Sequence, residues 1–255
     1  MIQPGDVILD GRYAVIKQIG KGGFCTTFEV QDRLETLPDG SHPIKIIKVL
    51  EPGNFNSNDA ETATRLFQRE AEVLKGLNHS GSPTVGQDGY FPFRCPQTEQ
   101  RLYCLVMEKI EGQDLKRWLD RNPPISEAQA LDWLEQIVKI LARIHPNFLH
   151  RDIKPSNIML RPNGELVLID FGAVKELTKT YENKTKILSP GFTPKEQINR
   201  DPKIQSDFFA LGRTFVNLLT GTHPTDLNED SRTEKLIWRE EAPLISDDLV
   251  DLIDL

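Results

Sequence analysis

The sequence predicts an α+β fold in two lobes, a small lobe built mainly of β-strands and a larger, mainly helical one. Up to about residue 111, short β-prone runs alternate with turn residues such as Pro38-Asp39-Gly40. After Gly112, apolar residues recur at intervals of three and four over long stretches, which is the spacing of amphipathic helices. We therefore expect an N-lobe over about 1–111, a C-lobe over about 112–255 and a hinge at Gly112.

The β-prone runs of the N-lobe predict an antiparallel meander accompanied by one helix. Strands are expected at 13–19, 28–30, 44–50, 84–91 and 102–107. The helix is expected over 63–77, where apolar residues such as Leu66 and Val73 lie at helical intervals.

A pair of long helices dominates the prediction for the C-lobe. Ser126 followed by Gln129 is a capping-box signal, and it introduces an amphipathic helix that should run to about Ile144. Residues 207–219 are apolar around most of the helical circumference, and Gly221 follows them as a helix terminator. These residues predict the buried axis of the C-lobe.

The end of the sequence predicts a further helix. Ser246 is a good N-cap, and the two aspartates after it are typical of a first helical turn. The apolar pattern of this helix still continues at Leu255, so we expect the domain to extend past that residue.

Composition excludes several classes of partner and compartment. Lys and Arg number 31 against 38 Asp and Glu, and the net charge of −7 disfavours nucleic acid and anionic membranes as partners. Cys25, Cys95 and Cys104 form no CxxC pair, so neither a disulfide framework nor a zinc site is predicted. Apolar runs such as 166–169 are far shorter than the roughly 20 residues that span a bilayer, and residues 1–6 carry no secretory signal. We therefore expect a cytoplasmic chain without a membrane segment.

A polar motif, His-Arg-Asp-Ile-Lys-Pro-Ser-Asn at 150–157, lies between the long helix and the apolar strand expected at 166–169. Phosphoryl transfer needs a carboxylate to orient the attacking hydroxyl, a cation near the phosphate and oxygen ligands for a metal ion. These groups are supplied by Asp152, Lys154, Asn157 and Asp170. Asp170 begins Asp-Phe-Gly, whose glycine lets the backbone turn sharply after the metal ligand. Each residue alone is typical of an ordinary loop, but the ordered combination is very improbable by chance.

Taken in order, these motifs resemble the eukaryotic-like (Hanks-type) serine/threonine protein kinase family. The resemblance covers 13–255 and implies the bilobal kinase fold, with ATP and Mg²⁺ or Mn²⁺ as cofactors. It also implies that Asp152, Lys154 and Asn157 are catalytic, and that Asn157 and Asp170 hold the metal. The style of the motifs is similar to bacterial members, cyanobacterial ones in particular.

The resemblance assigns the glycine-rich loop over the phosphates of ATP to the start of the N-lobe. Its cofactor-binding residues are Ile19, Gly20, Lys21, Gly22, Gly23, Phe24 and Thr27. Missing side chains let the backbone N–H groups approach the phosphates. Cys25 stands where the family has its third glycine, and Thr27 where a valine usually covers the adenine, so loop mobility and purine fit depart from the family pattern.

Lys48 resembles the phosphate-binding lysine of the third strand, and Glu70 the helix glutamate that pairs with it. Lys45 and Glu72 are the alternatives. Strand alternation places Lys45 and Lys48 on opposite faces, and the Val-Leu that follows Lys48 matches the family. We therefore assign Lys48 and Glu70 to the nucleotide, and Lys45 and Glu72 to solvent.

Further nucleotide contacts follow from the same resemblance. Met107 resembles the gatekeeper, and the backbone groups of Glu108 and Ile110 are expected to bind the adenine edge. Asp114 is expected near the ribose, and Met159 on the floor of the pocket. Core packing is the ordinary role of both methionines, and adenine pockets are built from such core side chains.

Protein hydroxyls are the substrates that the resemblance implies. Lys154, two residues after the catalytic aspartate, is typical of the serine/threonine branch. Ser189 lies seven residues before Glu196, where the family usually has a threonine that contacts the catalytic aspartate and lysine. Glu196 ends Thr-Pro-Lys-Glu in place of Ala-Pro-Glu, and the arginine that pairs with it in the family should lie beyond this sequence.

Thr185 is predicted to be an activating site of self-phosphorylation, because it lies four residues before Ser189, at the family's spacing. A phosphate there would bridge Arg151 and Lys175 through charge-assisted hydrogen bonds. Without it, we expect Arg151 to be an unpaired cation beside Asp152.

An active serine/threonine kinase competes with two other interpretations: a kinase-like scaffold that binds nucleotide without catalysis, and a kinase of small molecules. A scaffold would be favoured by loss of Lys48, Asp152, Asn157 or Asp170, and all of them are present. Small-molecule kinases generally lack the substrate segment at 189–196. We therefore predict a protein kinase, although the sequence does not name its substrate.

Overall fold

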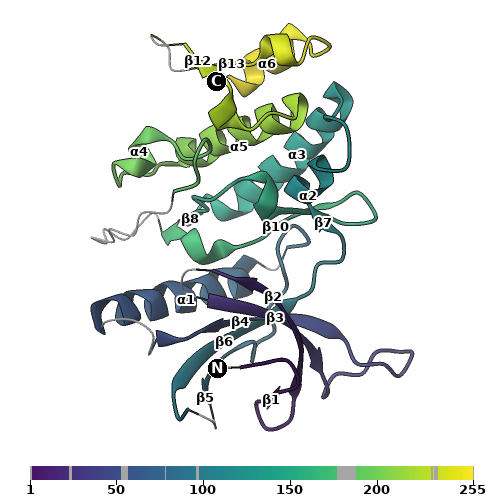
Figure 1. Ribbon diagram of the computed structural model, residues 1–255, viewed down its shortest axis with the longest axis vertical. Coiled ribbons are helices and arrows are strands. Elements are labelled where there is room, and N and C mark those ends of the chain that lie inside the picture. The colour runs from purple at the N-terminus through teal and green to yellow at the C-terminus, as the bar shows by residue number, and fades with distance from the viewer. Residues whose placement is uncertain are drawn as a thin grey trace. The chain divides into compact units, whose positions relative to one another are not determined.

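The computed structural model describes residues 2–22, 25–52, 57–77, 79–95, 98–176, 188–230, 232 and 235–254. The chain divides into two compact units, Met1–Ile110 and Glu111–Leu255 (Figure 1). Strands dominate unit 1 and helices dominate unit 2, which confirms the predicted α+β fold class.

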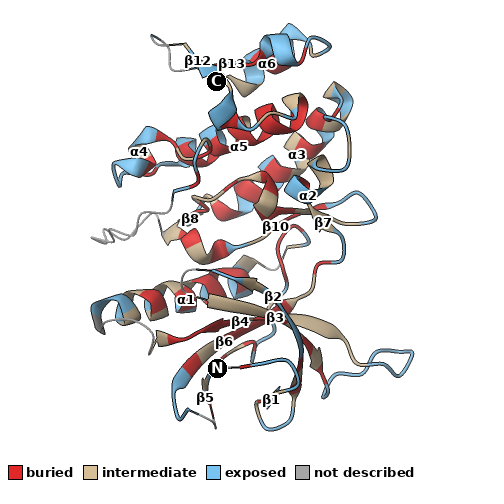
Figure 2. Ribbon diagram, in the orientation of Figure 1, coloured by how far each residue is buried: buried red, intermediate tan, exposed pale blue. Residues whose placement is uncertain are grey.

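An antiparallel sheet forms the described part of unit 1, with strand order β1-β2-β3-β4-β6-β5. Its strands are β1 (Val7–Ile8), β2 (Tyr13–Lys21), β3 (Cys25–Asp32), β4 (Ile44–Leu50), β5 (Tyr90–Arg94) and β6 (Arg101–Glu108). The helix α1 (Ser57–Leu77) contacts β4. Phe28, Ile47 and Val49 belong to one buried apolar cluster. Figure 2 shows the buried residues of these strands in red. Because side chains alternate along a strand, Lys48 faces the opposite side of the sheet.

The structure corrects two predicted elements of unit 1. The strand expected over 84–91 begins only at Tyr90, because the chain first turns, with the N–H of Gly89 donating to the carbonyl of Gly86 at 2.9 Å. The helix expected from residue 63 already begins at Ser57. Its first turns are polar and carry no apolar pattern, but Asp59 is favourable there because carboxylates are stabilised near a helix N-terminus.

The long helices α3 (Glu127–Ile144) and α5 (Ile204–Thr220) contact each other in unit 2. The predicted start of α3 is confirmed, since the backbone N–H of Gln129 donates to the hydroxyl of Ser126 at 3.3 Å. The residues that α3 buries are spaced mainly three and four apart: Ala130, Trp133, Ile137, Ile140, Leu141 and Ile144. As predicted, α5 is followed by Gly221 in the left-handed conformation, with φ of +75°.

The buried axis predicted along α5 is confirmed only for its later turns. Most of 210–219 is buried, but the side chains of Phe208 and Phe209 are 44% and 38% exposed. The ring of Phe208 packs edge-on against that of His145, and the guanidinium of Arg213 lies 4.9 Å from the ring centroid of Phe209. Polar partners thus replace core contacts at the start of the helix.

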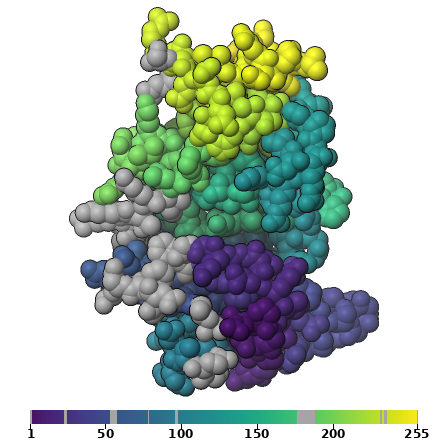
Figure 3. Space-filling model, in the orientation of Figure 1, coloured from purple at the N-terminus to yellow at the C-terminus, as the bar shows by residue number. Residues whose placement is uncertain are grey.

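Short elements complete unit 2. They are α2 (Leu115–Leu119), α4 (Lys195–Ile198), α6 (Asp247–Ile253), the pair β8 (Phe148–Leu149) with β11 (Lys175–Glu176), the pair β12 (Asn228–Glu229) with β13 (Leu236–Ile237), and a three-stranded sheet of β10 (Leu166–Leu168), β9 (Ile158–Leu160) and β7 (Gln113–Asp114). The helix α6, yellow in Figure 3, begins after Ser246 as predicted and contacts α5. None of the described helices is both long enough and apolar enough to cross a bilayer.

Gly112, predicted as a hinge, has a local steric role within unit 2. Its φ is +130°, and a Cβ at this position would overlap the carbonyl oxygen of Leu160 in β9. Only glycine permits so close an approach. The residue therefore allows β7, which follows it directly, to pair with β9.

Candidate active site

A buried aspartate of α5 anchors the loop that carries the predicted catalytic residues. Asp207 is 0% exposed, and its carboxylate accepts hydrogen bonds from the backbone N–H groups of His150 at 2.8 Å and Arg151 at 2.7 Å. The ring nitrogen Nε2 of His145 lies 3.0 Å from the same carboxylate. Hydrogen bonds to a charged acceptor are among the stronger ones in proteins, so Asp207 fixes the backbone just before Asp152.

Arg151 holds a left-handed backbone conformation, with φ of +67°. For a residue with a side chain this conformation costs on the order of 1 kcal/mol and requires support from its surroundings. Besides the bond to Asp207, its carbonyl accepts a hydrogen bond from the amide of Gln197 at 2.8 Å. Its Nε donates to the carbonyl of Ala173 at 2.5 Å. The expectation that Arg151 lacks a partner without a phosphate is therefore wrong.

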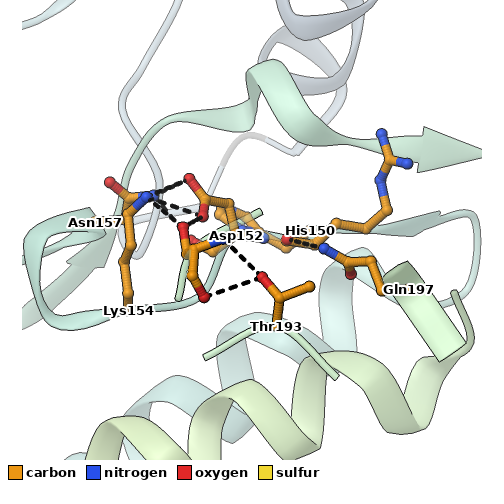
Figure 4. A network of polar contacts seen from close by, with 8 residues as sticks. His150, Asp152, Lys154, Asn157, Thr193 and Gln197 are labelled. Atoms are coloured by element: carbon orange, nitrogen blue, oxygen red, sulfur yellow. Dashed lines mark hydrogen bonds and ion pairs between the residues drawn. The ribbon is translucent and has the colours of Figure 1, made fainter. Parts of the chain in front are cut away.

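Asp152 lies at the centre of a polar cluster (Figure 4). The ammonium group of Lys154 donates to both of its carboxylate oxygens, at 2.9 and 2.8 Å. The amide nitrogen of Asn157 donates to Oδ2 at 2.9 Å, and the hydroxyl of Ser189 donates to Oδ1 at 2.6 Å. Lys154 also donates to the hydroxyl of Ser189 at 2.9 Å, so the contact of Ser189 with the aspartate and the lysine is present as predicted.

The two predicted metal ligands lie on adjoining loops. The amide nitrogen of Asn157 is engaged with Asp152, and its amide oxygen points away from that carboxylate (Figure 4). The backbone N–H of Ile169, the neighbour of Asp170, donates to the carbonyl of Asn157 at 2.9 Å. Asp170 itself is left-handed, with φ of +63°, and begins the turn at Phe171. An amide oxygen and a carboxylate are ligands that Mg²⁺ accepts when water and substrate phosphates supply the others.

His150 is the first residue of the catalytic loop, residues 150–157, and its side chain is buried in the interior. Its ring is fully buried and meets the ring of Phe171 edge-on, with centroids 5.0 Å apart. Burial lowers the pKa of His150, and this outweighs the opposite influence of nearby aspartates such as Asp207. Its Nε2 makes no hydrogen bond within the described residues, and Nδ1 accepts a long one, 3.4 Å, from the N–H of Asp152. His150 is thus a neutral packing residue at pH 7.

In unit 1, an ion pair joins β4 to α1. The ammonium group of Lys48 donates to the carboxylate of Glu70 at 2.6 Å, and their side chains are only 16% and 3% exposed. Lys45, which was assigned to solvent, instead pairs with Glu35 and with Asp32, and its side chain is only 23% exposed. The carboxylate of Glu72 accepts a hydrogen bond from Gln68 at the helix surface. The pair predicted for the nucleotide is therefore the one that forms.

Comparison with known proteins identifies the family. The sequence profile of the protein kinase domain matches residues 13–253. The chain belongs to the protein kinase family. It is 36% identical to serine/threonine-protein kinase F of Synechocystis sp., over 97% of this chain and 51% of that protein, and 37% identical to serine/threonine-protein kinase PknA of Nostoc sp., over 97% and 44%. It is 31% identical to serine/threonine-protein kinase PrkC of Bacillus subtilis, over 86% and 32%.

These likenesses confirm the predicted similarity to bacterial and cyanobacterial members. The kinase domain spans about half the length, or less, of the curated relatives named here. The family in general uses ATP and a divalent metal ion.

The glycine-rich loop of the kinase domain joins β2 to β3. In the described part of this hairpin Gly20 pairs with Thr27, and the N–H of Gly22 donates to the carbonyl of Cys25 at 2.8 Å. An added Cβ at Gly20 would meet nothing closer than 3.8 Å, so the folded chain itself does not require glycine there. The predicted residues Gly23 and Phe24 lie outside the described residues, and Ile19 is 45% exposed.

The predicted adenine and ribose residues are distributed over both units. In unit 1, Met107 and Ile110 are buried, and the N–H of Glu108 is already bonded to the carbonyl of Thr84 at 2.8 Å. In unit 2, Asp114 pairs with Met159 across β7 and β9. The carboxylate of Asp114 also caps α2 by accepting from the backbone N–H of Arg117 at 2.9 Å. Asp114 thus has a structural role that the sequence did not reveal.

The segment that contains Ser189 is tied to the rest of unit 2 through its far end. The carboxylate of Glu196 accepts a hydrogen bond from the hydroxyl of Ser206 at 2.7 Å. Sequence reasoning anticipated an arginine beyond this chain, and Ser206 supplies an additional anchor from within it. Thr185, the predicted phosphorylation site, lies outside the described residues.

Sequence reasoning missed two residues that hold the catalytic loop, Asp207 and Gln197. Asp207 was placed only at the start of a helix. A carboxylate next to an apolar helical face was the available signal. Such a carboxylate is expected to be buried, and a buried carboxylate needs hydrogen-bond donors. Gln197, an amide only 8% exposed, carried no comparable signal.

Proposed function

We propose that this kinase domain transfers the γ-phosphate of ATP to serine and threonine hydroxyls of proteins. The observation that carries the proposal is the cluster in which Lys154, Asn157 and Ser189 all bind the carboxylate of Asp152. Membership of the kinase family and relatives named serine/threonine-protein kinases support it.

Asp152 is the group that orients the attacking hydroxyl and accepts its proton. The bond from Ser189 to Oδ1 is a direct example of this carboxylate receiving a serine hydroxyl, at 2.6 Å. Lys154 offsets the negative charge of Asp152, and its ammonium group can stabilise the negative charge of the phosphoryl group during transfer. The amide of Asn157 keeps the second carboxylate oxygen in a fixed direction.

Asn157 and Asp170 are the residues that would hold the metal ion, for which we propose Mg²⁺ or Mn²⁺. When bound, the ion neutralises charge on the phosphates. Within the described residues, no group of three or more histidine, cysteine, aspartate or glutamate side chains could hold a metal. A site of one amide and one carboxylate would be completed by water and phosphate oxygens.

In unit 1, we assign the phosphates of ATP to Lys48 and to the backbone of the glycine-rich loop. Glu70 keeps the ammonium of Lys48 in place at 2.6 Å. The space beside Gly20 supports this assignment, because the folded chain leaves it free of close contacts. The adenine and ribose roles of Thr27, Glu108, Ile110, Asp114 and Met159 are proposed from the family resemblance.

We also propose that the chain works in the cytoplasm. None of the three cysteines forms a disulfide in the described part of the chain, and we propose a reducing cytoplasm, where ATP is available, as its setting. The partners proposed are ATP and protein substrates, among them the chain itself at Thr185.

The test is incubation of the protein with γ-labelled ATP, Mg²⁺ and a generic protein substrate, followed by identification of the labelled amino acid. Label on phosphoserine or phosphothreonine is expected, in the substrate and in the chain itself. Label on phosphotyrosine alone would contradict the substrate class. Nucleotide binding without any transfer would instead establish the scaffold interpretation.

A further inference from the structure

The hydroxyl of Thr193 engages both backbone polar groups of a single residue, Ser189. Its Oγ1 accepts a hydrogen bond from the N–H of Ser189 at 2.7 Å and donates to the carbonyl of Ser189 at 3.1 Å. A hydroxyl has one proton to donate. Thr193 therefore uses both its acceptor and its donor capacity on the backbone of the same residue. Figure 4 shows the two bonds converging on Thr193.

The two backbone groups of Ser189 do not depend on Thr193 equally. The carbonyl of Ser189 also accepts from the N–H groups of Phe192 and Thr193, each at 3.0 Å. The N–H of Ser189 has Thr193 Oγ1 as its partner, and Ser189 is only 8% exposed. Among the residues that the structure describes, removal of the hydroxyl would therefore leave the Ser189 N–H without a partner, in a place with little access to water.

The turn from Ser189 to Thr193 is also confined from outside. Gly191 has φ of +80°, and an added Cβ would lie 3.1 Å from Cβ of Pro224 and 3.2 Å from Cγ2 of Thr225. Because the N–H and the carbonyl of Ser189 are both hydrogen-bonded, the direction of its hydroxyl is set mainly by rotation of its own side chain. That hydroxyl lies 2.6 Å from Asp152 Oδ1 and 2.9 Å from the ammonium of Lys154.

We propose that Thr193 is a positioning residue for phosphoryl transfer, which acts by holding the backbone of Ser189 so that the serine hydroxyl fixes Asp152 and Lys154. This inference rests on the proposed function and deepens it. Thr193 is 41 positions from Asp152 in the sequence, yet a single residue links the two.

A matched pair of substitutions separates the hydroxyl from the shape of the side chain. Thr193→Val keeps the branched shape and removes the hydroxyl, whereas Thr193→Ser keeps the hydroxyl. We expect Thr193→Val to lower kcat about tenfold, equivalent to about 1.4 kcal/mol of transition-state stabilisation, with KM for ATP unchanged. Thr193→Ser should restore most of the turnover. Equal losses in both variants, or no loss in Thr193→Val, would overturn the proposal.

A double-mutant cycle tests whether Thr193 acts through Ser189. In a Ser189→Ala background the hydroxyl that meets Asp152 is already gone, so Thr193→Val should lower kcat no further. A further tenfold loss in that background would show an independent role for Thr193 and contradict the inference.

Amide hydrogen exchange at Ser189, followed by NMR, supplies a readout that does not need turnover. Exchange should be faster in Thr193→Val than in the unaltered protein and in Thr193→Ser. An inactive unaltered protein would refute the proposed function, while this exchange pattern would still support the bond on which the inference depends. Unchanged exchange in Thr193→Val contradicts the inference whether or not the protein is active.

Discussion

Replacement of Asp207 by asparagine should loosen the catalytic loop from its helix. The carboxylate accepts two short backbone hydrogen bonds, 2.8 Å from His150 and 2.7 Å from Arg151. Asparagine has one acceptor oxygen in place of two, so one of these bonds is lost. The backbone N–H that loses its acceptor then faces the NH₂ group of the asparagine. A hydrogen bond to a charged group contributes about 1.5–3 kcal/mol, so we expect the free energy of unfolding to fall by this amount.

The loss should be visible both in stability and in turnover. For a domain of this size, about 1.5–3 kcal/mol corresponds to a Tm lower by roughly 3–12 °C in scanning calorimetry. The left-handed backbone of Arg151 would also lose support. We therefore expect kcat to fall even at 25 °C, where the variant is still folded. Asp201→Asn is the matched control, because that side chain is 71% exposed and pairs only with Lys203 in the described structure. Equal effects of the two substitutions would mean that the loop does not depend on the carboxylate of Asp207.

The remaining predictions concern charge, pH and phosphorylation. Lys48→Met should abolish phosphate transfer while the far-UV circular dichroism stays unchanged, whereas Lys45→Met should leave transfer within a few-fold; the reverse result would contradict the strand register. The pKa of His150 is lower in the folded than in the unfolded protein, so the unfolded state takes up more protons below pH 6.5 and stability should fall as pH drops through that range. Urea titrations between pH 7.5 and 5.5 should show this fall, and it should be smaller in His150→Leu but unchanged in His223→Gln. Thr185 should carry phosphate after incubation with ATP, and mass spectrometry that finds it unmodified in fully active protein would contradict this assignment.

The catalytic cluster could be predicted because most of its contacts are local. Asp152 meets Lys154 two residues away and Asn157 five residues away, so a single loop supplies them all. The alternation of side chains along a strand placed Lys45 and Lys48 on opposite faces. The Val-Leu after Lys48, which matches the family pattern, then decided between them. Ser189, 37 residues from Asp152, was found through its spacing from Glu196 in a known family pattern.

The supports of the cluster could not be predicted in the same way. Asp207 and Gln197 bind backbone groups 57 and 46 residues away, and every non-proline residue offers such groups. When a side chain binds a backbone group, the amino-acid type of its partner therefore gives no sign of the contact. Likewise, the sequence predicts that Phe208 in α5 belongs to the core. In the structure its side chain is 44% exposed and packs against the ring of His145.

The turnover of Asp152→Asn, measured together with its affinity for ATP, tests the central claim most directly. Asparagine keeps the size of the side chain but cannot accept the proton of the attacking hydroxyl, so the lost interaction belongs to the transition state. We expect a kcat lower by several orders of magnitude and an ATP affinity close to that of the unaltered protein. Asp132→Asn, on the surface of α3, is the control. Near-normal phosphate transfer by Asp152→Asn would contradict the claim.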